Sequence, residues 1–244
     1  GAATVTTING TNSTANLTVT SGAGDDTITG GTGNDSITLT GGTNNVTGGN
    51  GNDTIILSTG NDTVNTGSGD DNVTAAAGTN NITTGTNNDQ ITLTGGTNTV
   101  NTGDNNDVVN SSGGDSNITT ESGNDQVTLS GSGTNTVNTG SNNDVVNASA
   151  GDNNITTESG SDQVTLSGGT NTVNTGSNGD TINVSGGVNN ITTADGGDQV
   201  TLTGGTNTVD TGSSGDTVTL SSGTDTVDTG SGNDTVEAGG TLTT

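Results

Sequence analysis

Aspartate recurs along this chain at a spacing that could bind metal ions. It returns with an 18-residue period, broken once by a 19-residue interval between Asp125 and Asp144. If successive repeats stack, these carboxylates repel one another unless cations lie between them. Calcium suits such a column, because it accepts about six to eight oxygen ligands in tolerant geometry. We therefore expect several calcium ions between the carboxylates of one column of aspartates: Asp35, Asp53, Asp71, Asp89, Asp107, Asp125, Asp144, Asp162, Asp180, Asp198, Asp216 and Asp234.

No side chain of this protein could replace those cations. The sequence has 26 acidic residues and no Lys, Arg or His, for a net charge of −26. A chain without basic groups is not expected to bind nucleic acid or anionic membrane surfaces, and no apolar run is long enough to insert into a membrane. An enzyme is not expected either, because His, Cys, Lys, Arg and Tyr are all absent as bases, nucleophile partners or oxyanion donors.

The elements that position the aspartates follow from a nine-residue repeat. Composition alone, with 21 % hydrophobic residues and no aromatic residue, is typical of a disordered chain. A nine-residue period is instead typical of a β-helix, in which each coil is covered by its neighbours and needs only a thin apolar strip. Each repeat combines a Gly/Asn/Ser turn of about five residues with a strand of about four, whose side chains alternate between inside and outside.

Strand, turn, strand and turn make an 18-residue coil, so successive aspartates would stack about 4.8 Å apart. We predict an all-β fold, a right-handed parallel β-roll or β-solenoid with two short strands per coil and about 12 to 13 coils. A second, 36-residue period, seen in Gln163–Leu166 and Gln199–Leu202, makes a 36-residue coil conceivable. Two alternating 18-residue coils are favoured, because the Asp column itself does not alternate.

The organisation along the chain is simple. Residues 1–21 are expected to form an atypical N-terminal capping coil, with Leu17 and Val19 in register with the later columns. Residues 22–244 are expected to form a single continuous domain, in which Thr241–Thr244 continue as a strand. The extra residue of the 19-residue interval is placed in the turn Ser130–Gly133, where it would bulge without shifting the stack.

The nonapeptides resemble the RTX calcium-binding repeats, with consensus Gly-Gly-x-Gly-x-Asp-x-U-x, where U is a large apolar residue. Gly30–Thr38 and Gly48–Ile56 match this consensus at every position. The resemblance implies that each calcium lies between successive turns, held by Asp carboxylates and turn carbonyls. Where Asn87, Asn105 and Asn142 replace the glycine two residues before Asp, the turn should survive, because Asn adopts the left-handed conformation more readily than most residues.

The opposite turns depart from the family pattern. The position equivalent to the aspartate is mostly Asn there, as in Asn44 and Asn98, and a neutral amide is a poor sole calcium ligand. We expect an Asn ladder in which each amide hydrogen-bonds to the next coil. Additional metal sites are candidates only where this column is acidic, at Asp26, Asp62 and Asp225.

The residues on the outer faces of the predicted strands give an indication of function. Thr and Asn alternate from coil to coil on one face, as at Thr99, Asn117 and Thr136. We expect an extracellular structural protein, secreted or on the cell surface, that associates with its own copies end to end or laterally as a filament, surface layer or adhesin stalk. Open strand edges favour association, and a head-to-tail contact that does not close yields a filament.

Three alternatives stay open. The Thr/Asn rows resemble those of ice-binding RTX adhesins, so ice or a glycan surface is an alternative partner, although those adhesins present their rows in the metal-binding turns. The chain is also compatible with the secretion-associated repeat domain of a larger secreted protein. Recent duplication alone would also leave such a regular pattern.

One outward strand carries N-glycosylation motifs in every second coil. Such motifs also arise by chance in a chain this rich in Asn and Thr. The candidate glycosylation sites are Asn45, Asn81, Asn117, Asn154 and Asn190.

Overall fold

The computed structural model describes residues 4–239. The fold is a parallel β-solenoid of about 13 turns, in which each coil contributes two strands and two turns. No helix in residues 4–239 is long and apolar enough to span a membrane. The chain forms two compact units, one up to Ser122 and one from Gly123. Each unit is described by itself.

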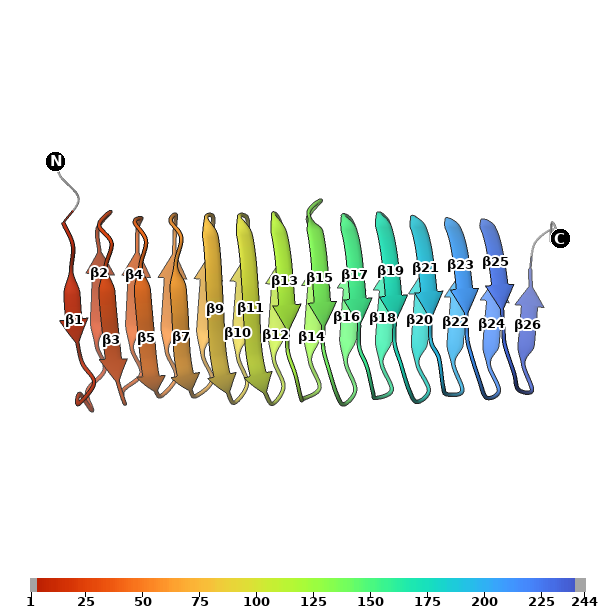
Figure 1. Ribbon diagram of the computed structural model, residues 1–244, viewed down its shortest axis with the longest axis horizontal. Coiled ribbons are helices and arrows are strands. Elements are labelled where there is room, and N and C mark those ends of the chain that lie inside the picture. Colours follow the sequence, from red (N-terminus) through yellow and green to blue (C-terminus); the bar gives the residue numbers. More distant parts are fainter. Residues whose placement is uncertain (1–3, 240–244) are drawn as a thin grey trace. The chain divides into compact units, whose positions relative to one another are not determined.

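In the first unit, each strand pairs in parallel with the next strand of its own parity, so odd-numbered and even-numbered strands form two separate sheets. Figure 1 shows the odd-numbered strands running down the view and the even-numbered strands running up it. The odd-numbered strands are β1 (Thr7–Asn9), β3 (Thr27–Gly31), β5 (Asn45–Asn50), β7 (Thr63–Ser68), β9 (Thr79–Thr86), β11 (Thr97–Asp104) and β13 (Asp115–Thr119). The even-numbered strands are β2 (Thr18–Ser21), β4 (Ser36–Leu39), β6 (Thr54–Leu57), β8 (Asn72–Ala75), β10 (Gln90–Leu93) and β12 (Val108–Ser111).

The second unit repeats this arrangement. Its even-numbered strands are β14 (Gln126–Leu129), β16 (Val145–Ala148), β18 (Gln163–Leu166), β20 (Thr181–Val184), β22 (Gln199–Leu202), β24 (Thr217–Leu220) and β26 (Thr235–Ala238). Its odd-numbered strands are β15 (Thr134–Asn138), β17 (Asp152–Thr156), β19 (Thr170–Asn174), β21 (Val188–Thr192), β23 (Thr206–Asp210) and β25 (Thr224–Asp228).

The register confirms the 18-residue coil. Ile37 of β4 pairs with Ile55 of β6, and Val164 of β18 pairs with Ile182 of β20. A 36-residue coil is therefore wrong, because each strand pairs with the equivalent strand of the very next coil. Equivalent side chains of successive coils consequently stack into columns.

The 19-residue interval is absorbed in one turn, as predicted. Leu129 pairs with Ala148 across the longer interval, whereas Thr134 pairs with Asp152 at the ordinary 18-residue spacing. The extra residue therefore lies between positions 129 and 134, in the turn that precedes β15 (Figure 1).

The core is a thin strip between the two sheets. In β4 the exposure alternates, with Ser36 exposed and Ile37 and Leu39 fully buried, and the facing strand β5 contributes the buried Val46. Because each coil shields the next, Ile, Val and Leu suffice to close this interior without any aromatic residue.

The first coil is in register with the later columns, as predicted, but it lacks the aspartate. Val19 pairs with Ile37 as expected. Leu17 does not join an apolar column, because it occupies the position that aspartate holds in later coils, where its backbone N–H donates to Oδ1 of Asp35 at 2.7 Å. The predicted strand at Thr241–Thr244 lies outside the described residues.

Candidate metal centre

The predicted aspartates occupy one column of turns, each turn following an odd-numbered strand and preceding an even-numbered one. Asp35 lies between β3 and β4, and Asp162 lies between β17 and β18. Eleven of the twelve side chains are buried, with only 1–2 % of their surface exposed; Asp234, in the last described coil, is partly exposed. The column therefore faces the interior and is not a solvated polar edge.

In both units the aspartates use one carboxylate oxygen to accept a backbone N–H. The N–H of Asp35 donates to Oδ1 of Asp53 at 2.7 Å, and in the second unit the N–H of Asp162 donates to Oδ1 of Asp180 at 2.8 Å. The same bond recurs within each unit, in the second as far as Asp216 and Asp234, which it joins at 3.1 Å. This ladder fixes the orientation of the carboxylates, and sequence reasoning did not foresee it.

In nine of these aspartates the other oxygen has no donor within residues 4–239. In the described residues, Oδ2 is buried without a hydrogen-bond partner in Asp35, Asp53, Asp71 and Asp89 of the first unit and in Asp144, Asp162, Asp180, Asp198 and Asp216 of the second. A buried charged acceptor without a partner is strongly destabilising. Because the sequence contains no cationic side chain, a metal cation fits this column of oxygens.

The electrostatics of the column reflect this burial. Burial raises the pKa of Asp53 to about 7; the N–H of Asp35 opposes the rise, and the neighbouring carboxylates of Asp71 and Asp35 add to it. Burial likewise raises the pKa of Asp144 to about 7 and of Asp180 to about 6. Without bound cations, these carboxyl groups would titrate near neutral pH.

A second buried column accompanies the aspartates. Five residues before each Asp from Asp71 onward stands a threonine, and nine of these have no exposed surface: Thr66, Thr84, Thr102, Thr120, Thr139, Thr157, Thr175, Thr193 and Thr211. Sequence reasoning missed this column, although its regular period was available to reveal it. The Thr175 hydroxyl is close enough to Asp180 to oppose the rise of its pKa.

The two repeats that match the consensus fully have glycine at this position. A β-carbon added to Gly30 would overlap Oδ2 of Asp35 and lie 2.5 Å from the carbonyl oxygen of Gly48. One added to Gly48 would overlap Oδ2 of Asp53 and lie 2.8 Å from the carbonyl oxygen of Thr66. A carboxylate oxygen and a carbonyl oxygen thus border the same small space, a cradle that a side chain would fill.

Each cation would draw on few carboxylates. Within residues 4–239, no group of three or more acidic side chains surrounds a common point. A bound ion would therefore depend on carboxylates of successive coils together with turn carbonyls, which is the kind of all-oxygen ligand set that calcium accepts.

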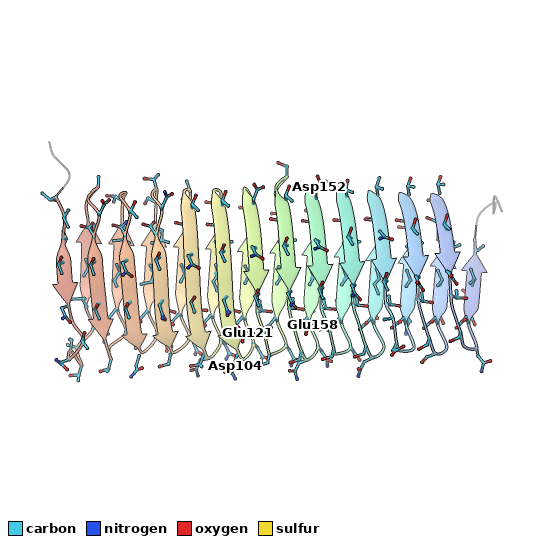
Figure 2. All side chains as sticks on the ribbon, in the orientation of Figure 1. Asp104, Glu121, Asp152 and Glu158 are labelled. Atoms are coloured by element: carbon cyan, nitrogen blue, oxygen red, sulfur yellow. The ribbon has the colours of Figure 1, made fainter. Side chains whose placement is uncertain are left out.

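The turns hold the expected left-handed residues and some unexpected ones. Asn87, Asn105 and Asn142 have φ of 85°, 85° and 86°, as predicted. Glu121 and Glu158 also have positive φ, 67° and 64°, which is unusual for residues with long side chains. The amides of Asn101 and Asn138 donate to these two Glu carboxylates at 2.7 and 2.8 Å. In the second unit, Asp152 begins β17 and Glu158 follows its end, so the two residues lie at opposite ends of that strand (Figure 2).

The Asn ladder on the opposite side is confirmed. Nδ2 of Asn171 donates to Oδ1 of Asn189 at 2.7 Å and to the carbonyl of Gly168 at 3.0 Å. Asn153 and Asn189 make the same pair of bonds to their own neighbours. In these coils the side is therefore closed by neutral hydrogen bonds.

The three acidic residues of that column are inserted into the ladder. Oδ1 of Asp62 accepts Nδ2 of Asn44 at 2.7 Å, Oδ1 of Asp225 accepts Nδ2 of Asn207 at 2.6 Å, and Oδ1 of Asp26 accepts the N–H of Thr6 at 2.6 Å. Among the described residues, Oδ2 of Asp26 and of Asp62 is buried without a partner, and burial raises the pKa of Asp62. Asn44 separates these two carboxylates, so no pair of successive coils supplies two of them. Extra metal sites here stay a prediction.

The candidate glycosylation sites are accessible. All five asparagines are exposed on the outer face of the odd-numbered strands β5, β9, β13, β17 and β21. Glycosylation itself stays a prediction. The residues concerned are Asn45, Asn81, Asn117, Asn154 and Asn190.

Comparisons with known proteins agree with this geometry. The family described as "RTX calcium-binding nonapeptide repeat (4 copies)" matches residues 20–55, 38–73, 47–82, 56–91, 74–109, 101–130, 129–164 and 201–236. The fold is similar to the crystal structure of a hyperactive, Ca²⁺-dependent, β-helical antifreeze protein from an Antarctic bacterium, with a TM-score of 0.59 and 21 % identity. That similarity covers 96 % of this chain and 83 % of the other. No curated protein matches the chain.

Proposed function

Since the chain belongs to the family of RTX calcium-binding nonapeptide repeats, we propose that it is a non-enzymatic structural protein whose coils are held together by stacked calcium ions. The single observation that carries the proposal is the column of buried Oδ2 atoms that have no hydrogen-bond donor in residues 4–239. Bound calcium would supply positive charge to these oxygens. The available donors are carboxylate and carbonyl oxygens, which calcium prefers.

The same dependence supports a location outside the cell. A site that is complete only in the folded chain couples ion binding to folding. Calcium modules of extracellular proteins work at roughly 10⁻⁴–10⁻³ M calcium. A solenoid of this kind would then stay unfolded until it meets a calcium-rich medium, which suits a secreted or cell-surface protein.

We further propose that copies of the chain associate laterally, through the outer face of the odd-numbered sheet. In the second unit this face presents the exposed row Thr136, Asn154 and Thr172. End-to-end stacking receives less support, because Leu17 and the backbone of Thr6 stand where later coils offer carboxylate or amide acceptors. A coil stacked on that end would find no acceptor for the backbone N–H groups that form the ladder of hydrogen bonds between coils.

Electron microscopy with and without calcium tests this proposal. Filaments or bundles are expected in millimolar calcium and should disperse on chelation. The double variant Thr136→Lys/Thr172→Lys should abolish association by placing charge on the odd-numbered face, whereas Gln163→Lys/Gln199→Lys, on the even-numbered face, should leave it intact. Monodisperse particles of the unaltered protein in calcium would contradict self-association.

Ice binding is the second candidate function. It is favoured by the fold shared with a calcium-dependent antifreeze protein and by the regular Thr/Asn rows of the odd-numbered face. The turn positions three residues before Asp are less regular, as Thr32, Asn50 and Ser68 illustrate, so the flat sheet is the better candidate surface. An ice-growth assay in calcium tests the idea with the same two double variants. Loss of activity only in Thr136→Lys/Thr172→Lys would support it, and equal activity of both variants would contradict it.

A further inference from the structure

The Asp column contains two kinds of coil. In the coils of Asp35 and Asp53, glycine stands five residues before the aspartate and leaves the oxygen-lined cradle without a side chain. In the later coils a buried threonine stands there. Since Gly30 and Gly48 do not have left-handed φ, the backbone does not require glycine at this position, and the difference lies in what occupies the cradle.

The threonine takes up the oxygen that the glycine coils leave available. In the glycine coils the cradle is bordered by the carbonyl of the next coil, that of Gly48 or Thr66. In five of the threonine coils the hydroxyl donates to the equivalent carbonyl, as from Thr66 to Thr84 at 3.1 Å and from Thr157 to Thr175 at 3.2 Å. The other three bonds join Thr84 to Thr102, Thr193 to Thr211 and Thr211 to Thr229.

The threonine hydroxyl has a second acceptor within reach. In the glycine coils a β-carbon at this position would overlap Oδ2 of the aspartate, so the threonine side chain lies beside that oxygen, which in Asp162 has no hydrogen-bond partner among the described residues. A hydroxyl carries one proton, so it can serve the carbonyl or the carboxylate, but not both together. When no cation is bound, rotation of the hydroxyl would satisfy the carboxylate, a donor that the glycine coils lack.

We propose that the residue five positions before each aspartate sets the calcium affinity of its coil, so that the coils with Gly30 and Gly48 bind calcium more tightly than the threonine coils. The threonine side chain fills the cradle, and its hydroxyl competes for the carbonyl and the carboxylate oxygens. Changes in the groups that surround a metal site typically alter its affinity by about 10- to 100-fold. This inference rests on the proposed calcium binding.

A gain of affinity is the sharpest test. Thr157→Gly should open the cradle and free the Thr175 carbonyl, so this variant should retain one more ion than the unaltered protein at limiting calcium, with roughly tenfold higher affinity at that coil. Thr157→Ser keeps the hydroxyl and is the matched control, expected to behave as the unaltered protein. Native mass spectrometry counts the retained ions, calorimetric titration gives the affinity classes, and circular dichroism in saturating calcium verifies that each variant is folded.

The reverse exchange tests the glycine coils. Gly30→Thr should remove one ion from the tight class. Should this variant fail to fold in saturating calcium, Thr157→Gly alone decides the question. Unchanged ion counts and affinities in folded Thr157→Gly would overturn the inference while leaving calcium binding in place. An unaltered protein that binds no calcium at all would instead overturn the proposed function itself, and the inference with it.

Discussion

The Asn column and the Asp column both stack side chains from coil to coil, and the two side chains are nearly isosteric. On one side, Asn171 accepts with its oxygen and donates with its nitrogen, so each amide complements the next. On the other side, Asp180 has an oxygen in place of that nitrogen, and Oδ2 has no donor among the described residues. An amide column is therefore complete by itself, whereas a carboxylate column needs something positive from outside. The two columns thus differ by one atom per coil, and only the Asp column depends on cations from the medium.

Chelation of calcium should have the largest effect. At pH 7.5 the ionised carboxylates of the Asp column would repel one another, and the Asn ladder alone cannot hold the coils together. We expect loss of the β-sheet signal in circular dichroism after chelation and its return when calcium is restored. A signal that survives chelation would show that the Asn side suffices.

The pH dependence should reverse between the two conditions. Folding raises the pKa of Asp53 from 3.8 to about 7, so the calcium-free folded state binds more protons than the unfolded chain between these values. Its stability should then be greatest below about pH 4 and fall as the pH rises towards 7. In calcium, protons compete with the ion, so affinity should instead rise over the same range. Thermal unfolding at several pH values, with and without calcium, measures both trends.

Converting one carboxylate to an amide should make the Asp side locally resemble the Asn side. Asp180→Asn gives the unpaired oxygen position a donor, so in chelator the free energy of unfolding should rise by about 1–3 kcal/mol. In calcium the same variant should retain fewer ions and lose stability. Denaturant titrations in calcium, and in chelator at a pH low enough for the calcium-free chain to stay folded, check this change of sign; destabilisation in both would contradict the comparison.

The matched change on the Asn side should have the smallest effect on calcium binding. Asn171→Ala removes two hydrogen bonds of the amide nitrogen and leaves neighbouring acceptors unsatisfied, which costs about 1–3 kcal/mol. The number of bound calcium ions should not change. A loss of ions as large as that in Asp180→Asn would mean that the Asn side also binds metal.

Periodicity made the fold predictable. The spacing of the aspartates and of the Ile/Val columns sufficed to derive an 18-residue coil, two strands per coil, the inward Asp column and the Asn ladder. The extra residue at 130–133 could also be placed, because only a turn absorbs one residue without reversing the inside and outside of a strand.

The details that escaped prediction depend on backbone geometry. Which oxygen of Asp53 accepts the N–H of Asp35 is decided by the shape of the turn, which the repeat pattern does not specify. Leu17 resembles a core residue by type, yet stands at the aspartate position of the first coil. The burial of Thr66 was not predicted, because threonine is polar. Thr66 nevertheless lies two residues after the buried Val64, so the alternation of the strand also turns its side chain inward. The positive φ of Glu121 contradicts its residue preference, so sequence alone offered no signal.

The turn at 130–133 has a consequence for how such chains diversify. It holds one residue more than its neighbours while the strands on both sides keep their pairing. Duplication in whole coils lengthens the solenoid, whereas a change of any other length survives only in a turn of this kind. These turns are therefore the positions at which new sequence, natural or engineered, could be displayed at regular intervals without redesigning the stack.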